Sequence, residues 1–153
     1  MRTMTGFFGV LPAGHSERLR ELGREAAFPV GTRIFEEGMT ADRFWVLRTG
    51  SVSLDMRVPG RRAVVTDELG QGELLGWSWL FAPYVWRLGA EASSPVRALE
   101  FDAAPVRRLC AEDHELGHAL THAVAVVIGQ RLQRTRTRLL DVFGPGGEIP
   151  DGP

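Results

Sequence analysis

Residues 51–65 read SVSLDMRVPGRRAVV, and this stretch decides the fold class. Val52, Leu54 and Met56 alternate with polar residues, which is the period of two expected of a strand with one buried face. The Pro59-Gly60 pair then favours a turn, and a second run of apolar residues follows it directly. The stretch therefore predicts a β-hairpin with one face buried in a core.

Short apolar runs separated by glycines continue on both sides of this hairpin, from residue 28 to residue 102. They predict strands at 33–36, 43–48, 51–58, 63–69, 88–92 and 95–101. Strands at this density, joined by glycine turns, are typical of a sandwich or barrel rather than of alternating βαβ units.

Helical spacing replaces this pattern at both ends of the chain. Residues 15–27 predict a short amphipathic helix, and residues 103–112 predict another. Asp113 is a suitable cap for a third helix, which runs without proline from 115 to 143 and spans ~43 Å at ~1.5 Å per residue. A small β-domain does not need so long a helix, so part of it should contact another partner.

Composition and charge exclude several classes of protein. The 153 residues suit one domain, with 44% hydrophobic and 24% charged residues. Eighteen basic residues, all arginine, face nineteen acidic ones, so no global field attracts nucleic acid. The single cysteine forms no disulfide within the chain, and no apolar run reaches the ~20 residues of a membrane span. The N-terminus does not resemble a secretory signal, which predicts a cytoplasmic protein without a membrane partner.

Three glycine-bounded motifs follow one another along the β-rich region. They are Gly31-Thr-Arg-Ile-Phe-Glu-Glu-Gly38, Phe44-Trp-Val-Leu-Arg-Thr-Gly-Ser-Val52 and Leu69-Gly-Gln-Gly-Glu-Leu-Leu-Gly76. Their order and spacing resemble the cyclic-nucleotide-binding domain of the catabolite-activator type, over residues 16–143. The resemblance implies a mainly β fold with flanking helices, an eight-stranded jelly-roll barrel followed by a long C-terminal helix. It predicts an N-terminal extension at 1–14, the domain at 15–143 with a dimer helix at 115–143, and a flexible tail at 144–153.

The segment after Gly76 departs from this family. In nucleotide-binding members a glutamate that holds the ribose follows this glycine, and an arginine farther along pairs with the cyclic phosphate. Trp77 stands at the glutamate position here, and counting back from the next strand places Trp86 at the arginine position. An indole offers one N–H and no charge, whereas a buried phosphate needs a charge-assisted partner. The resemblance therefore implies a degenerate phosphate-binding cassette. The candidate ligand-binding residues are Gly76, Trp77, Ser78, Trp79, Trp86 and Arg87.

Several functions remain open for this aromatic segment. The rings could fill the vacated pocket, or they could wall a site for a flat or apolar ligand. A shift of one residue would instead return Arg87 to the phosphate and make the chain a cAMP- or cGMP-binding regulator. A subunit that docks on a protein without any small ligand is a further alternative. The prediction is a non-enzymatic regulatory or sensor module, with no cofactor beyond a possible cyclic nucleotide or other small ligand.

The long C-terminal helix carries an apolar stripe with the 4-3 spacing of a coiled-coil seam. The stripe consists of Ile128, Leu132, Thr135, Leu139 and Val142. In the family this helix pairs with its twin, so the stripe predicts a homodimer. Only ten residues follow Phe143 and cannot form a recognition helix, so no direct DNA binding is expected.

Catalytic and metal-binding patterns are weak. His114, His118 and His122 share one helix face, but three histidines along one helix cannot easily reach one ion, so a solvated or interface face is expected and no metal is predicted. Residues 28–102 contain no histidine, which argues against a metal triad inside the β-domain. Cys110 lies in an apolar helix and is interpreted as packing material.

Overall fold

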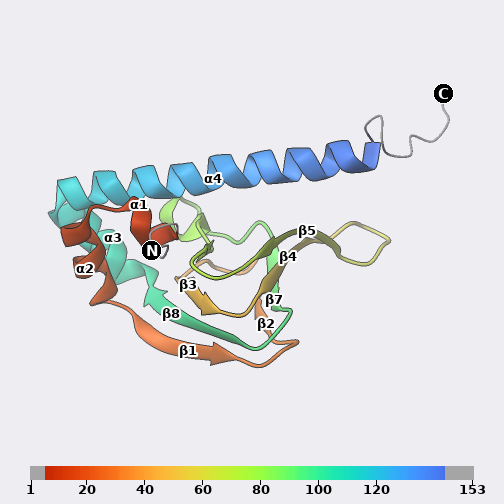
Figure 1. The fold of residues 1–153 in the computed structure, drawn as a ribbon, viewed down its shortest axis with the longest axis horizontal. Helices are drawn as coiled ribbons and strands as arrows, with labels where there is room; N and C mark the ends of the chain where they lie inside the picture. Colours follow the sequence, from red (N-terminus) through yellow and green to blue (C-terminus); the bar gives the residue numbers. More distant parts are fainter. Residues whose placement is uncertain (1–5, 144–153) are drawn as a thin grey trace.

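The computed structural model describes residues 6–143, with side chains up to Asp141. Two short helices, α1 (Phe7–Val10) and α2 (Ala13–Arg20), precede the strands, and α3 (Ala103–Glu112) and α4 (His114–Phe143) follow them (Figure 1). The eight strands are β1 (Arg24–Phe28), β2 (Arg33–Phe35), β3 (Arg43–Thr49), β4 (Val52–Met56), β5 (Val64–Leu69), β6 (Leu74–Leu75), β7 (Gly89–Ala92) and β8 (Val96–Asp102). The tail predicted at 144–153 lies outside the described residues.

The strands form two antiparallel four-stranded sheets, in the orders β1-β8-β3-β6 and β2-β7-β4-β5. The predicted class, eight strands with flanking helices and a long C-terminal helix, is confirmed. The two sheets do not join into a closed barrel. They share one hydrophobic core, to which α1 adds Phe7 and the chain just after it adds Leu11. Burial of this apolar surface is the main force that holds sheets and helices together.

The helix predicted over 15–27 is wrong in its second half. Helix α2 ends at Arg20, and β1 then pairs with β8 from Arg24 onward. The ring of Phe101 lies so close to Gly23 that a side chain there would collide with it. Pairing with β8 satisfies the backbone N–H and C=O groups of β1, which outweighs the weak helical pattern of this segment. The two-residue strand β6 was also not predicted, because so short a strand has no readable period.

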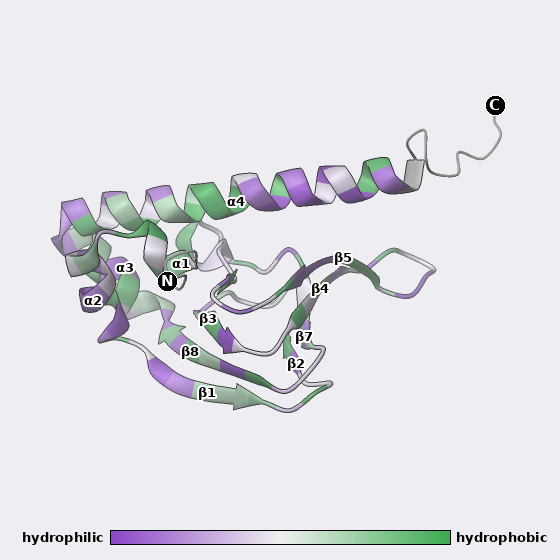
Figure 2. Cartoon of the chain, viewed as in Figure 1, coloured by the Kyte–Doolittle hydropathy of each residue, from purple (hydrophilic) through white to green (hydrophobic). Residues whose placement is uncertain are grey.

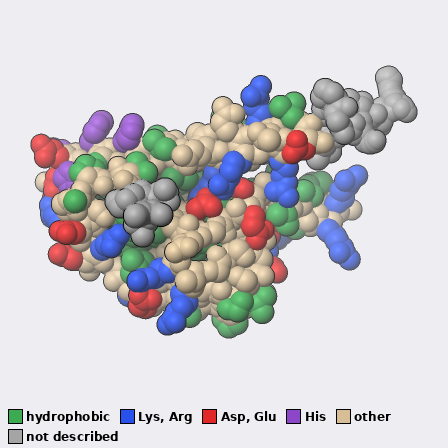
Figure 3. All heavy atoms as spheres, in the orientation of Figure 1, with side chains coloured by type: hydrophobic (Ala, Val, Ile, Leu, Met, Phe, Trp, Pro, Cys, Tyr) green, Lys and Arg blue, Asp and Glu red, His purple; other side chains and the backbone are tan. Residues whose placement is uncertain are grey.

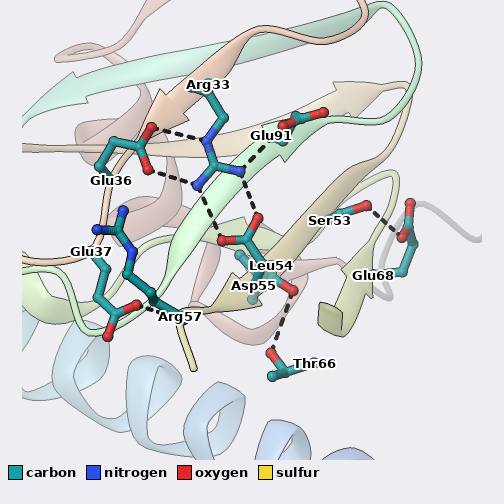
Figure 4. Close-up of polar contacts among 10 residues, drawn as sticks. All are labelled: Arg33, Glu36, Glu37, Ser53, Leu54, Asp55, Arg57, Thr66, Glu68 and Glu91. Atoms are coloured by element: carbon teal, nitrogen blue, oxygen red, sulfur yellow. Dashed lines mark hydrogen bonds and ion pairs between the residues drawn. The ribbon is translucent and has the colours of Figure 1, made fainter. Parts of the chain in front are cut away.

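A β-bulge breaks the alternation predicted for residues 51–58. The register between β4 and β5 shifts between Leu54 and Asp55, so the Asp55 side chain is buried and Met56 is 39% exposed. Asp55 accepts a hydrogen bond of 2.6 Å from Arg33, which also bonds Glu36 at 2.8 Å (Figure 4). The buried carboxylate is thus paired, as a charge inside a protein must be. The pKa of Arg33 is raised above its usual value, first by the hydrogen bond with Asp55.

Helix α4 divides into two halves with different surroundings. Its first half buries an apolar stripe against the core; the stripe is formed by Leu116, Leu120, Ala123, Val124 and Val127. Its second half extends along β5 and carries exposed leucines, of which Leu132 is 67% and Leu139 is 57% exposed (Figure 2). Among the described helices, none combines the length and apolarity needed to cross a membrane.

Candidate functional site

The indole of Trp79 bonds back to Gly76 and holds the segment between these two residues in a tight turn. Its chain makes a single 3₁₀ turn, η2 (Ser78–Leu80), and Trp79 is fully buried. The Trp79 ring stacks on Phe44 with centroids 4.0 Å apart, and its Nε1–H donates to the Gly76 carbonyl at 2.9 Å. Arg107 of α3 donates to the Trp79 carbonyl at 2.6 Å. Trp79 therefore belongs to the core that supports the turn and is not among the pocket-lining residues.

The ring of Trp86 covers Gly76 at the start of the same turn. Backbone hydrogen bonds hold it on both sides: its N–H donates to Met39 and its carbonyl accepts from Gly38, each at 2.9 Å. The indole stacks on Phe35 with centroids 3.9 Å apart. A Cβ at Gly76 would lie 2.6 Å from Cη2 of Trp86, so the ring fills the space directly over this glycine.

A small pocket opens beside these two indoles. Its lining residues are Phe35, Leu54, Gly76, Trp77, Ser78, Trp86, Arg87, Leu88 and Arg131. The pocket has a volume of about 70 Å³. Counted with its mouth, the empty space is about 380 Å³. Five of the six candidate ligand-binding residues line this pocket, with Ser78 buried, Trp77 half-buried and Arg87 exposed.

Arg131 of α4 is a lining residue that the sequence reasoning did not assign to the pocket. Its Nη2–H donates to the Leu74 carbonyl, while its Nε–H is shut off from solvent and has no acceptor. Burial lowers the pKa of Arg131 to about 10, against the opposing fields of Glu73 and Asp67, so the guanidinium stays charged at neutral pH. A signal did exist, because position 131 continues the buried stripe of α4 at helical spacing after Val124 and Val127.

The next turn of α4 is anchored by ion pairs. Arg134 contacts Asp67 of β5 at 2.7 Å and Glu73 at 3.0 Å. Helix α4 is thus tied to β5 and to the residue before β6, one turn away from the residue that lines the pocket.

The predicted dimer seam lies on the exposed half of α4. Leu132, Thr135 and Leu139 are exposed and Ile128 is half-buried. The side chain of Val142 lies outside the description. The exposed leucines of this half are not covered by the rest of the described chain, as expected of a helix longer than its own domain requires.

The three histidines lie on the surface at the N-terminal end of α4 (Figure 3). Over the described part of the chain, no group of three His, Cys, Asp or Glu side chains is placed to hold a metal ion. Cys110 is half-buried, and burial raises the pKa of its thiol, which is the behaviour of a packing residue rather than of a nucleophile.

Residues 25–113 match the family model described as the cyclic nucleotide-binding domain. The chain is 28% identical over 137 residues to a CRP-like cAMP-activated global transcriptional regulator of Mycobacterium tuberculosis. That alignment covers 90% of this chain and 59% of the regulator, so the chain spans about three-fifths of the length of the curated relatives it matches.

Two solved structures show the same arrangement of elements. The N-terminal domain of a transcriptional regulator from Streptomyces coelicolor is 29% identical, with a TM-score of 0.67 over 84% of this chain and 89% of that one. A cyclic nucleotide-binding domain from Methylobacillus flagellatus is 17% identical, with a TM-score of 0.79 over 94% of this chain and 83% of that one. The second likeness is one of fold alone.

Proposed function

This chain belongs to the cyclic nucleotide-binding domain family, and from that premise we propose that it is a non-enzymatic, cytoplasmic regulatory domain with a degenerate phosphate-binding cassette. Its relatives by sequence are transcriptional regulators. The proposed mechanism couples the packing of residues 76–87 to helix α4 through the pocket wall that Arg131 forms.

The position of the Trp86 indole carries this proposal. In the family the backbone after Gly76 binds the cyclic phosphate, and here the ring lies against Gly76 and leaves no room for even a methyl group. An ionised phosphate would have to displace an indole that is stacked on Phe35 and buried. Trp77 supplies no carboxylate for the ribose. The remaining space, about 70 Å³, is too small for a nucleotide without such a displacement.

Arg87 supports a second candidate function. It lines the pocket next to Trp86 and is exposed, so its guanidinium is free to turn toward an anion at the pocket mouth. A cyclic nucleotide held by Arg87, with its base stacked on the indoles, would make the chain a genuine cAMP- or cGMP-binding regulator.

Titration with cyclic nucleotides distinguishes the two functions. We expect cAMP and cGMP, up to millimolar concentration, to cause no saturable change in tryptophan fluorescence and no shift in the melting temperature beyond about 1 °C. A bound ligand would raise the melting temperature, because binding stabilises the folded state by RT ln(1 + [L]/Kd). The cAMP-activated regulator from Mycobacterium tuberculosis is the positive control. If cAMP or cGMP binds saturably and Arg87→Gln abolishes that binding, the proposal of a degenerate cassette is wrong. The chain is then a cyclic-nucleotide-binding regulator that uses Arg87.

We also propose that the chain is a homodimer through the exposed half of α4. Leu132 and Leu139 lie seven residues apart on one face and are more than half exposed. A soluble helix rarely leaves such a stripe uncovered, and an identical stripe on a second copy would bury it. The same helix carries Arg131 in its other face, so dimer assembly and the pocket share one rigid element.

The double substitution Leu132→Glu with Leu139→Glu should convert the dimer into a monomer. Two carboxylates in an apolar seam lose hydration without gaining partners, so we expect the dimer dissociation constant to rise by about 100-fold or more. Light scattering at micromolar concentration measures the mass. The matched control, Gln133→Glu with Thr137→Glu, adds the same charges outside the seam and should leave the dimer intact. A wild-type chain that is monomeric under these conditions would refute the homodimer.

A further inference from the structure

Positive charge is in excess in the wall of the pocket. Its lining includes two arginines and no acidic side chain. The nearby carboxylates of Asp67 and Glu73 both contact Arg134, on the turn of α4 that follows. Arg131 forms no ion pair among the described residues, although its side chain is half-buried.

The donors of Arg131 are also mostly unused. A guanidinium has five N–H groups in a planar fork that suits a carboxylate. The structure gives an acceptor to Nη2 alone, the Leu74 carbonyl, and leaves Nε buried without one. The buried Nε is closed off from the pocket as well, so an anionic ligand there would pair with the charge of Arg131 through the remaining guanidinium N–H groups.

The rest of the pocket is apolar and mainly aromatic. Phe35, Trp77 and Trp86 supply flat surfaces, and Leu54 and Leu88 complete the walls. Aromatic faces favour offset stacking with another ring. The limited volume excludes large ligands, and a single ring would extend into the mouth, with which the empty space is about 380 Å³.

We propose that this pocket binds a small single-ring aromatic carboxylate, with the carboxylate on Arg131 and the ring against the indoles of Trp77 and Trp86. The proposal rests on the proposed function, because it requires that the pocket is not a cyclic-nucleotide site. An aromatic carboxylate would then be the signal that the domain detects. Since Arg131 is part of α4, the ligand would contact the helix that we propose as the dimer interface.

Three probes separate the features that the ligand needs. Benzoate has both ring and charge, benzamide has the same shape without charge, and acetate has the charge without the ring. We expect calorimetry and tryptophan fluorescence to show benzoate binding about 10- to 100-fold tighter than benzamide, the value of a charge-assisted hydrogen bond, and acetate binding weakest. Equal affinity for benzoate and benzamide, or no binding of any probe at millimolar concentration, would overturn the proposal.

Substitutions at Arg131 locate the carboxylate. Arg131→Gln should reduce benzoate affinity to that of benzamide without changing benzamide binding, whereas Arg131→Lys keeps the charge and should retain part of the preference. Arg136→Gln, on an exposed position of the same helix, is the control and should change neither affinity. Melting temperatures of all variants verify folding. A benzoate preference that survives Arg131→Gln in a folded variant would contradict the assignment of Arg131.

The nucleotide titration separates this inference from the proposed function. Saturable cAMP or cGMP binding that depends on Arg87 would refute the proposed function itself. Failure of the aromatic carboxylates together with failure of the cyclic nucleotides would refute only the ligand class, and the degenerate cassette would stand.

Discussion

Replacing Trp79 by alanine should lower the free energy of unfolding by about 3–5 kcal/mol, the usual cost of removing a large buried ring. The side chain is fully buried, stacks on Phe44 at 4.0 Å and donates a hydrogen bond of 2.9 Å to the Gly76 carbonyl. A domain of this size has roughly 5–15 kcal/mol of stability, so the loss is a large fraction of the total. Urea denaturation should show a midpoint lower by about 2 M.

Two further substitutions separate the contributions of Trp79. Trp79→Phe keeps a ring on Phe44 but leaves the Gly76 carbonyl without its donor, and should cost about 1–3 kcal/mol. Trp77→Ala removes a half-buried indole whose ring packs edge-on against Phe81, and should cost about 1 kcal/mol. If Trp79→Ala cost no more than Trp77→Ala, the closed turn after Gly76 would not be held by this indole.

Replacing Gly76 by alanine should cost about 2–5 kcal/mol, for two reasons. The residue has a φ of +96°, which costs an L-residue roughly 1–2 kcal/mol. A Cβ there would also meet the Trp86 ring at 2.6 Å and 2.9 Å, and overpacking of this kind costs roughly 1–3 kcal/mol. Gly38→Ala is the matched control, because Gly38 has a φ of +93° and no atom within 4 Å of its Cβ position.

A double-mutant cycle then isolates the contact between Gly76 and Trp86. In the Trp86→Leu background we expect Gly76→Ala to cost no more than Gly38→Ala, because the ring that the Cβ meets is gone. Chemical denaturation of the four variants gives the coupling energy. An equal cost of Gly76→Ala in both backgrounds would mean that the indole does not press on this glycine, and the filled cassette would lose its main support.

The proposed filling of the phosphate position changes which residues could act on a ligand. The Trp86 ring lies against Gly76, and Trp77 stands where the resemblance places a carboxylate. The half-buried cation in the pocket wall is Arg131, which comes from α4 rather than from the strands. Regulation in this chain is therefore proposed to act on α4 directly, through the residue that both lines the pocket and bonds to β6.

The candidate site was predictable in part. The resemblance places Trp77 and Trp86 at the two charged positions of the cassette, and both residues line the pocket. Trp79 was predicted as a ligand-binding residue but lies in the core, because the 3₁₀ turn over Ser78–Leu80 places its ring against Phe44 and away from the pocket. Arg131 was missed, since its location depends on how α4 crosses β6.

The sequence by itself determined the element types where a local period is long enough to read: the strands on either side of Pro59-Gly60, the helix at 103–112 and the long helix ending at Phe143. Only the tertiary structure decided the role of residues 24–28, the burial of Asp55 and the placement of Arg131 in the pocket. A local period reports which face of an element is apolar. It does not report which distant strand supplies hydrogen bonds, where a bulge exchanges the two faces, or which side chain a neighbouring helix presses against the core.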